Sequence, residues 1–202
     1  MASFGGANPV HAKESPQAAK VLVLGDSLSA EYGLKRGTGW VALMEQRMVA
    51  DKVTATVVNA SISGDTTSGG RSRLPALLAQ HKPTVVVIEL GGNDALRGLP
   101  LSMTQDNLLA MTRAAQASGA KVLLAGMQVP PNYGQEYTKR FSETFATVAK
   151  ATKAALVPFL LKGVADVPNA TALFQADRIH PKEEAHPTIL NTMWPPIKNL
   201  LR

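Results

Sequence analysis

The sequence predicts a single α/β domain, in which helices cover both faces of a parallel five-stranded sheet. Three observations lead to this prediction. Short apolar segments rich in β-branched residues alternate along the chain with longer segments whose apolar residues recur at helical spacing. The segment at residues 84–90 is apolar on both faces, as a central parallel strand is. The chain has 202 residues, which is enough for one such domain and too few for two.

Five strands are expected from the apolar segments. They are residues 21–24, 53–59, 84–90, 121–126 and 155–159. In a parallel sheet the loops that follow the strands gather at one edge, and ligands bind in the crevice there. Polar residues in those loops are therefore the first candidates for a functional site.

The first two expected helices lie on either side of the second strand. The first carries Trp40, Met44 and Met48 on one apolar stripe. The second should follow a loop of small residues at 60–70, and Pro75 should lie in its first turn or kink it.

Three more helices are expected. The third should begin with a capping box formed by Ser102 and Gln105. The fourth follows a loop rich in Pro, Asn and Gly at residues 129–134. The last should span residues 186–201, interrupted where Pro195 and Pro196 remove backbone donors.

Composition narrows the function classes. The formal charge is +6, but the basic residues are scattered without an aromatic-studded patch, so no nucleic-acid partner is expected. The chain has no cysteine, which excludes disulfides, thiolate metal sites and cysteine nucleophiles. No apolar run is long enough to span a bilayer, and no signal-peptide core precedes residue 20. We expect residues 1–19 to form a flexible tail and residues 20–202 to form the folded domain.

Candidate catalytic residues fall in the loops after the first and fifth strands. Ser27 follows the first strand within Gly-Asp-Ser-Leu-Ser, where a glycine turn can expose a nucleophilic hydroxyl. The motif is not the G-x-S-x-G elbow of α/β-hydrolases. Asp177 and His180 are three residues apart, so the carboxylate can orient the imidazole as a general base. The alternatives are an ordinary capping serine and an ordinary surface turn.

Two further loops can supply donors to an oxyanion. Asn93 follows the most buried strand in Gly-Gly-Asn-Asp, and its amide can donate a hydrogen bond. Gly64 can offer its backbone N–H from the loop after the second strand. The alternatives are a capping role for Asn93 and a simple turn at Gly64. Together the four loops supply a nucleophile, a base, an orienting carboxylate and oxyanion donors at one sheet edge.

No metal or cofactor is expected. No nucleotide-binding glycine motif follows a strand. The remaining polar residues of these loops and the other histidines do not have the spacing of metal ligands. We expect the aspartates to cap backbone groups and the histidines to be solvated; they are Asp26, Asp65, Asp94, His11, His81 and His186.

These motifs resemble the GDSL/SGNH hydrolase superfamily, whose name letters match Ser27, Gly64, Asn93 and His180. The similarity extends from about residue 20 to residue 201 and is closest to bacterial multifunctional esterases with thioesterase, lysophospholipase and arylesterase activity. It implies a flavodoxin-like three-layer α/β/α sandwich. It also implies a Ser27–Asp177–His180 triad, and an oxyanion hole made by Ser27, Gly64 and Asn93.

The resemblance further implies how substrate is bound. The loop at 95–100 is expected to move on substrate binding, and the acyl-chain contacts are expected at Leu96, Leu99, Val129, Pro130 and Tyr133. The partner would be a small acyl ester or thioester, with transient contact to lipid surfaces, and the location periplasmic or secreted. Glu31 and Arg178 depart from the family's small residue and glycine, and are expected to affect substrate choice.

The expected activity is hydrolysis of carboxylic esters and thioesters of acyl chains through an acyl-enzyme. One alternative is a short-chain aryl or carbohydrate acetyl esterase using the same site. The alternative from another class is a non-catalytic lipid-binding protein, which would bind fatty acid without turnover.

Overall fold

The computed structural model describes residues 18–202, so the expected tail lies almost entirely outside the described residues. All five expected strands are present within one to two residues of the expected limits. The first begins at Ala19, one residue before the expected start of the domain. The strands are β1 (Ala19–Gly25), β2 (Ala55–Asn59), β3 (Val85–Glu89), β4 (Lys121–Ala125) and β5 (Ala155–Val157).

The sheet is parallel throughout, with the strand order β2-β1-β3-β4-β5. Strand β1 pairs with β2 on one side and β3 on the other, so it lies next to the point where the chain crosses the sheet. That position is the topological switch point at which open α/β sheets bind ligands. The flavodoxin-like order that the resemblance implied is therefore confirmed.

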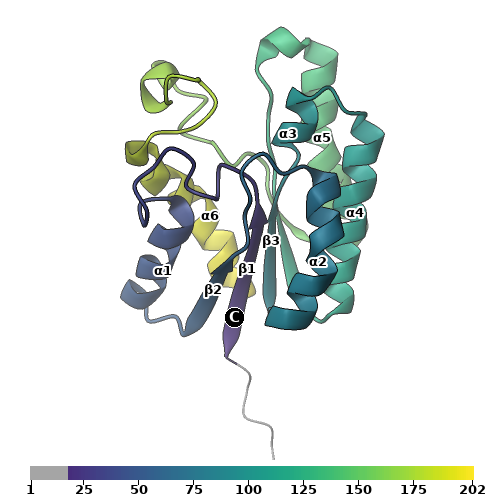
Figure 1. The fold of residues 1–202 in the computed structure, drawn as a ribbon, viewed down its shortest axis with the longest axis vertical. Helices are drawn as coiled ribbons and strands as arrows, with labels where there is room; N and C mark the ends of the chain where they lie inside the picture. Colours follow the sequence, from purple (N-terminus) through teal and green to yellow (C-terminus); the bar gives the residue numbers. More distant parts are fainter. Residues whose placement is uncertain (1–17) are drawn as a thin grey trace, which may run out of the picture.

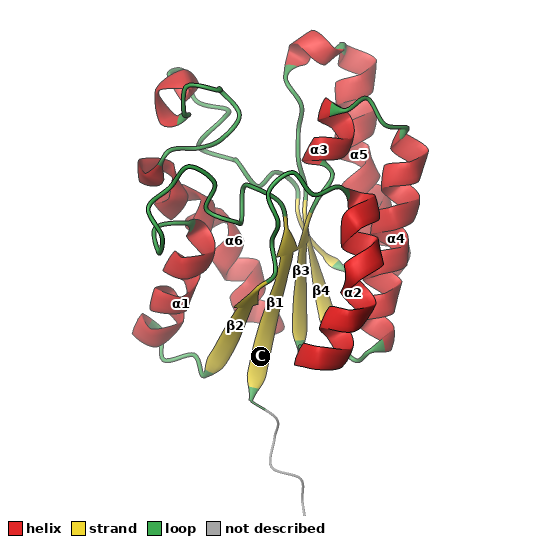
Figure 2. Ribbon diagram, viewed as in Figure 1, coloured by secondary structure: helices red, strands yellow, loops and turns green. Residues whose placement is uncertain are grey.

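Helices cover both faces of the sheet, which makes three layers (Figure 1). One layer holds α1 and α6, which pack against each other. The other holds α2, α4 and α5, in which α4 contacts both neighbours. Figure 2 shows the loops gathered above the carboxyl ends of the strands, between the two helical layers. The helices are α1 (Trp40–Ala50), α2 (Thr67–His81), α3 (Gly92–Leu96), α4 (Leu101–Ala117), α5 (Gln135–Thr152) and α6 (His186–Leu200).

The core is centred on β1 and β3. Four consecutive apolar residues of each strand are fully buried, because helices cover both faces of the sheet. The largest buried side chains beside them include Trp40, Phe141 and Phe145. None of the helices in residues 18–202 has the length and apolar character needed to cross a bilayer.

The prediction that residues 60–70 form a loop is wrong at its end. Helix α2 begins at Thr67, and the Thr66 side chain caps it by accepting a hydrogen bond from the Gly69 N–H. Gly70 lies within this helix, and the close packing against Leu90 requires a glycine there. A Cβ at this position would lie 2.2 Å from a Leu90 methyl. Pro75 therefore lies in the helix interior and not in its first turn.

Helix boundaries differ from the predictions at three other places. The expected capping box is absent, since α4 begins at Leu101 without a side-chain cap. The expected loop at 95–100 starts within the short helix α3. Helix α6 continues through Pro195 and Pro196, because buried apolar residues on both sides of the prolines hold it to the core.

Candidate active site

The half-buried Ser27 lies two residues after the end of β1, in a tight turn. The carbonyl of Asp26 accepts hydrogen bonds from the N–H groups of Ser29 and Ala30, at 3.2 and 3.0 Å. This turn lies at the end of a strand whose last five residues are buried, so the core fixes its position. The Ser27 hydroxyl lies 2.8 Å from the His180 Nε2.

The second half of the site comes from the long loop between β5 and α6. The His180 Nδ1 lies 2.6 Å from one carboxylate oxygen of Asp177. The other oxygen of Asp177 accepts hydrogen bonds from the N–H groups of Ile179 and His180, at 2.9 and 3.0 Å. The structure therefore brings Ser27, His180 and Asp177 into one hydrogen-bonded chain.

Electrostatics keep Asp177 ionised. Burial opposes ionisation, but the hydrogen bonds from the His180 side chain and from the His180 and Ile179 N–H groups outweigh it and lower the pKa of Asp177 to about 2. A charged carboxylate at Nδ1 favours the imidazole tautomer with its proton on Nδ1. Nε2 is then free to accept the serine proton.

Two backbone N–H groups, in the loops after β1 and β2, have no partner among the described residues. Gly64 has a φ of 78°, in the left-handed region that favours glycine, and its carbonyl accepts a hydrogen bond from Arg97 at 2.8 Å. Within residues 18–202, the N–H groups of Ser27 and Gly64 donate to no protein acceptor. Both donors are therefore available to a ligand oxygen.

Asn93 is the second residue of the short helix α3, and its side-chain amide lies between the loops that carry Ser27 and Gly64. It donates to a carboxylate oxygen of Asp26 and to the carbonyl of Asp65, both at 2.9 Å. Both amide hydrogens are thus used within the protein. Donation to an oxyanion requires one of these bonds to lengthen or to be shared.

A buried acid behind the nucleophile turn was missed by the sequence analysis. Glu89, at the end of β3, is fully buried and accepts hydrogen bonds from the Ser29 hydroxyl at 2.7 Å and from the Asp26 N–H at 3.3 Å. Its other carboxyl oxygen has no protein partner within the described part of the chain. The signal was present in the sequence, because Glu89 is the one charged residue in an otherwise apolar strand.

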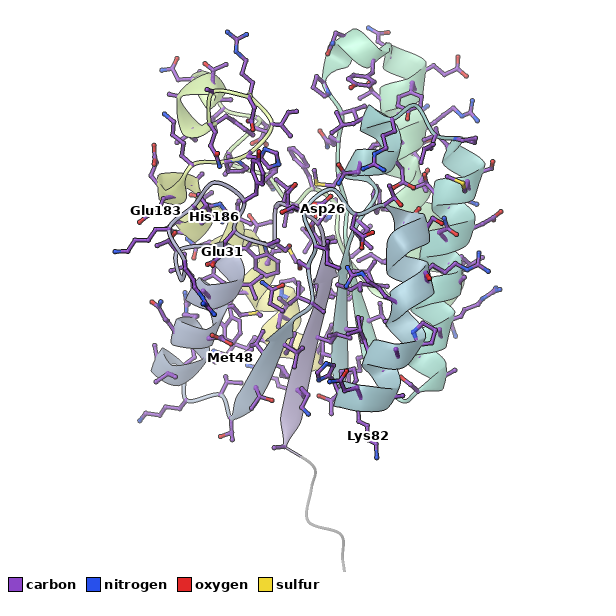
Figure 3. All side chains as sticks on the ribbon, viewed as in Figure 1. Asp26, Glu31, Met48, Lys82, Glu183 and His186 are labelled. Atoms are coloured by element: carbon purple, nitrogen blue, oxygen red, sulfur yellow. The ribbon has the colours of Figure 1, made fainter. Side chains whose placement is uncertain are left out.

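Two carboxyl groups therefore share the space beneath the active site. Burial, followed by the nearby Asp26, raises the pKa of Glu89 well above its usual range. Burial also raises the pKa of Asp26 to about 6, although hydrogen bonding to the Leu28 N–H and the charge of His180 oppose this. Figure 3 shows Asp26 above the end of β1, between the helical layers.

The loop aspartates bind backbone groups as predicted. Asp26 accepts from the Leu28 N–H, Asp65 from the Thr66 N–H and Asp94 from the Thr67 N–H. Among residues 18–202, no three His, Asp or Glu side chains are grouped as metal ligands.

The prediction that the other histidines are solvated is wrong for His186. His186 is buried, and its Nδ1 accepts a hydrogen bond from the Trp40 N–H at 3.0 Å. It begins α6 beneath the active-site loops, so it packs against the start of α1 instead of facing solvent. His81 is half-buried, and His11 lies outside the described residues.

The residues expected to contact the acyl chain are placed unevenly. Leu96 and Tyr133 are exposed, with 46% and 37% of their surface accessible, and Pro130 is also exposed. Leu99 is half-buried. Val129 is part of the hydrophobic core and has little surface to offer a ligand. All five lie in loops or short helices at the carboxyl edge of the sheet.

The two departures from the family pattern share a backbone feature. Glu31 and Arg178 both have a φ of 60°, in the left-handed region where glycine is favoured. The carboxylate of Glu31 turns back to its own loop and accepts hydrogen bonds from the Gly37 and Gly39 N–H groups. Arg178 is exposed next to the Asp177–His180 pair.

Comparison with known proteins identifies the family of this chain. The family model of GDSL-like lipases and acylhydrolases matches residues 23–187. Esterase TesA from Pseudomonas aeruginosa is 53% identical, over 90% of this chain and 89% of that protein. Thioesterase 1/protease 1/lysophospholipase L1 of Escherichia coli K12 is 41% identical, over 86% of this chain and 80% of that protein. The crystal structure of the psychrotrophic esterase EstA from a Pseudoalteromonas species, inhibited by monoethylphosphonate, has a TM-score of 0.84 and 42% identity, covering 90% of this chain and 98% of that one. The chain therefore belongs to the GDSL-like lipase/acylhydrolase family.

Proposed function

We propose that this protein hydrolyses carboxylic esters and thioesters of acyl chains, with Ser27 as nucleophile, His180 as general base and Asp177 as the residue that orients it. Ester hydrolysis follows from membership of the family; the residues and the range of substrates are the proposal. The observation that carries it is the continuous chain of short contacts, 2.8 Å from Ser27 to His180 and 2.6 Å from His180 to Asp177.

In the first step His180 Nε2 takes the Ser27 proton while the serine oxygen bonds to the acyl carbonyl carbon. The carbonyl oxygen becomes an oxyanion, for which the N–H groups of Ser27 and Gly64 and the Asn93 amide are the proposed donors. Asp177 stabilises the imidazolium. The tetrahedral intermediate then collapses, and the alcohol or thiol leaves with the proton from Nε2.

In the second step water repeats the sequence on the acyl-enzyme. His180 removes a proton from the water, whose oxygen attacks the acyl carbon of the Ser27 ester. Collapse of the second intermediate releases the carboxylic acid and returns the proton to Ser27. No net change in Ser27, His180 or Asp177 remains after one turnover.

A fluorophosphonate probe tests whether Ser27 is activated. The expected result is a single adduct by intact mass, mapped to Ser27 by peptide analysis. The matched control is Ser29→Ala, which removes the other serine of the motif and should leave the adduct on Ser27. A folded protein without an adduct, or with the adduct elsewhere, would contradict the proposal and favour a non-catalytic lipid-binding protein.

Turnover gives the second test. Ser27→Ala should lower kcat by about 10⁴–10⁶-fold without changing the fold, because the nucleophile is lost while binding remains. Rates should be measured with a series of p-nitrophenyl esters and acyl thioesters of increasing chain length. A sharp optimum at acetyl, without thioester turnover, would replace the proposed substrate class with short-chain acetyl esters.

We also propose transient contact with lipid surfaces. Within residues 18–202, five of the six exposed large apolar side chains lie at the carboxyl edge of the sheet, around the site; they are Tyr32, Ile62, Leu96, Tyr133 and Ile179. The net charge of +6 favours an anionic surface. Co-sedimentation with anionic and with neutral vesicles tests this, and Ile62→Ser should weaken it. Equal recovery of wild type and variant in the supernatant would contradict it.

The expected periplasmic or secreted location is part of the proposal and rests on the resemblance to the family. Fractionation of the producing cells, followed by immunoblotting, tests it. Recovery only with a cytoplasmic marker would contradict it.

A further inference from the structure

We propose that Tyr32 is a positioning residue that holds the His180 imidazole in register with Ser27. The inference rests on the proposed roles of Ser27 and His180. It concerns the loop at residues 31–39, which follows the nucleophile turn and leads into α1. None of the motifs in the sequence analysis includes Tyr32.

Three contacts connect Tyr32 to both halves of the site. Its N–H donates to the carbonyl of Ser27 at 3.4 Å. Its ring packs on the His180 imidazole, with the ring centroids 4.3 Å apart and the planes tilted by 37°. Its carbonyl accepts a hydrogen bond from the Gln175 side chain at 2.9 Å. Tyr32 therefore contacts Ser27 through its own backbone and His180 through its own ring, and so links the nucleophile to the base.

Gln175 connects the loop that carries His180 to Tyr32. Its side-chain amide also donates to the carbonyl of Pro181 at 3.1 Å, and its N–H donates to the carbonyl of His180 at 2.8 Å. Residues 176–179, which precede His180, are exposed, and Ile179 retains 45% of its accessible surface, whereas Pro181 on the other side is buried. The core thus gives this segment little support, and contacts with Tyr32 and Gln175 take its place.

Glu31 fixes the conformation of the Tyr32 loop. Its φ of 60° is unfavourable for a residue other than glycine, so the surroundings must stabilise this backbone conformation. The carboxylate accepts three hydrogen bonds, at 3.0 and 3.1 Å from the Gly37 N–H and at 2.8 Å from the Gly39 N–H. Gly39 directly precedes the buried Trp40, so the carboxylate ties the loop to the start of α1.

Ring packing matters because the imidazole has two tasks. Nδ1 must stay at Asp177 while Nε2 faces Ser27, and a displacement of about 1 Å can cost about 100-fold in rate. The aromatic face also favours the positive charge that the imidazole acquires in the transition state. The Tyr32 hydroxyl takes part in none of the three contacts, so phenylalanine should replace tyrosine.

Kinetics of Tyr32→Leu and Tyr32→Phe test the proposal. Tyr32→Leu should lower kcat by about 10- to 100-fold with KM nearly unchanged, and Tyr32→Phe should retain kcat within about twofold. Far-ultraviolet circular dichroism and a urea melt show whether the variants are folded. A rise in KM at constant kcat would assign Tyr32 to substrate binding and overturn the proposal, as would normal kinetics of Tyr32→Leu.

A double-mutant cycle tests whether Glu31 acts through Tyr32. Glu31→Ala alone should lower kcat, and adding it to Tyr32→Leu should cause little further loss. The matched control is Asp166→Ala, which removes another exposed loop carboxylate that accepts from a glycine N–H and should leave kcat unchanged. Additive losses would overturn the role of Glu31. If Ser27→Ala were also active, the proposed function would fail; if only the Tyr32 variants were normal, this inference alone would fail.

Discussion

The two halves of the active site are built in different ways. Ser27 and Asn93 follow β1 and β3, the two most buried strands, and polar groups without solvent contact support them from below. Asp177 and His180 lie in a long, largely exposed loop after β5, which has only three residues. The core therefore positions the nucleophile and oxyanion donors, whereas surface contacts position the base. Changes in the first half should alter stability and activity together, and changes in the second half should alter activity alone.

The largest separation of activity from stability is expected for Asp177→Asn. The variant keeps an oxygen for the Ile179 and His180 N–H groups but places an amide at Nδ1, which favours the wrong imidazole tautomer. We expect kcat to fall by about 10⁴-fold and the free energy of unfolding to change by less than about 0.5 kcal/mol. Steady-state rates and urea titrations measure the two quantities, with Asp166→Asn as the control on the same loop. A large loss of stability would remove the distinction between the halves.

Asn93→Ala should affect both quantities. Loss of an oxyanion donor should raise the barrier by about 2.7–4 kcal/mol, and kcat should fall by about 10²–10³-fold. The Asp26 carboxylate and the Asp65 carbonyl also lose their donor, which should lower the free energy of unfolding by about 1–3 kcal/mol. Rates and urea titrations on one preparation measure both losses. Unchanged kcat in the folded variant would return Asn93 to a capping role.

The smallest effect concerns the pH dependence of stability. The pKa of Asp26 is about 6 in the folded protein, above the 3.8 of an unburied aspartate, because of burial. Between these values the folded state holds a proton that the unfolded state has lost, so stability falls as pH rises through this window, by up to about 1.4 kcal/mol per pH unit. Asp26→Asn removes this dependence of the unfolding free energy on pH. The new amide also shifts the unfolding free energy by a constant amount at every pH.

Urea titrations from about pH 4 to about pH 8 measure this difference. The unfolding free energy of Asp26→Asn minus that of wild type should rise with pH up to about 6 and stay constant above. Glu89→Gln is the matched control: burial and the nearby Asp26 raise the pKa of Glu89 well above its usual range, so this variant removes a second slope and should leave that of Asp26 in place. Parallel curves for wild type and Asp26→Asn would show that burial does not raise the pKa of Asp26, and would contradict the assignment of Asp26 to the half that the core positions.

The same division explains what could be predicted from sequence. Strands and their order follow from short-range patterns and from the resemblance, and Ser27, Gly64, Asn93, Asp177 and His180 lie in recognisable motifs. The start of α2 was missed because Gly69 and Gly70 look like loop residues until the contact with Leu90 is known. The continuity of α6 through two prolines depends on packing that no local pattern contains.

The supporting residues were missed for a similar reason. Glu89, Tyr32 and Gln175 act through contacts between segments that are far apart in the chain, and only the folded topology brings them together. His186 was expected in solvent because its burial depends on the Trp40 N–H of another helix. The roles of the motif residues stay predictions until the variants above are measured.

Within the β5–α6 loop, the exposed segment at residues 176–179 that leads to His180 is weakly attached, and this has a consequence for the behaviour of the protein on heating. A segment with few buried apolar contacts opens at lower free energy than the sheet to which it is attached. Detachment of this loop carries His180 away from Ser27 while β1 and β3 remain folded. Thermal inactivation should therefore begin below the melting temperature of the domain and reverse on cooling, so the working temperature range is set by one surface loop.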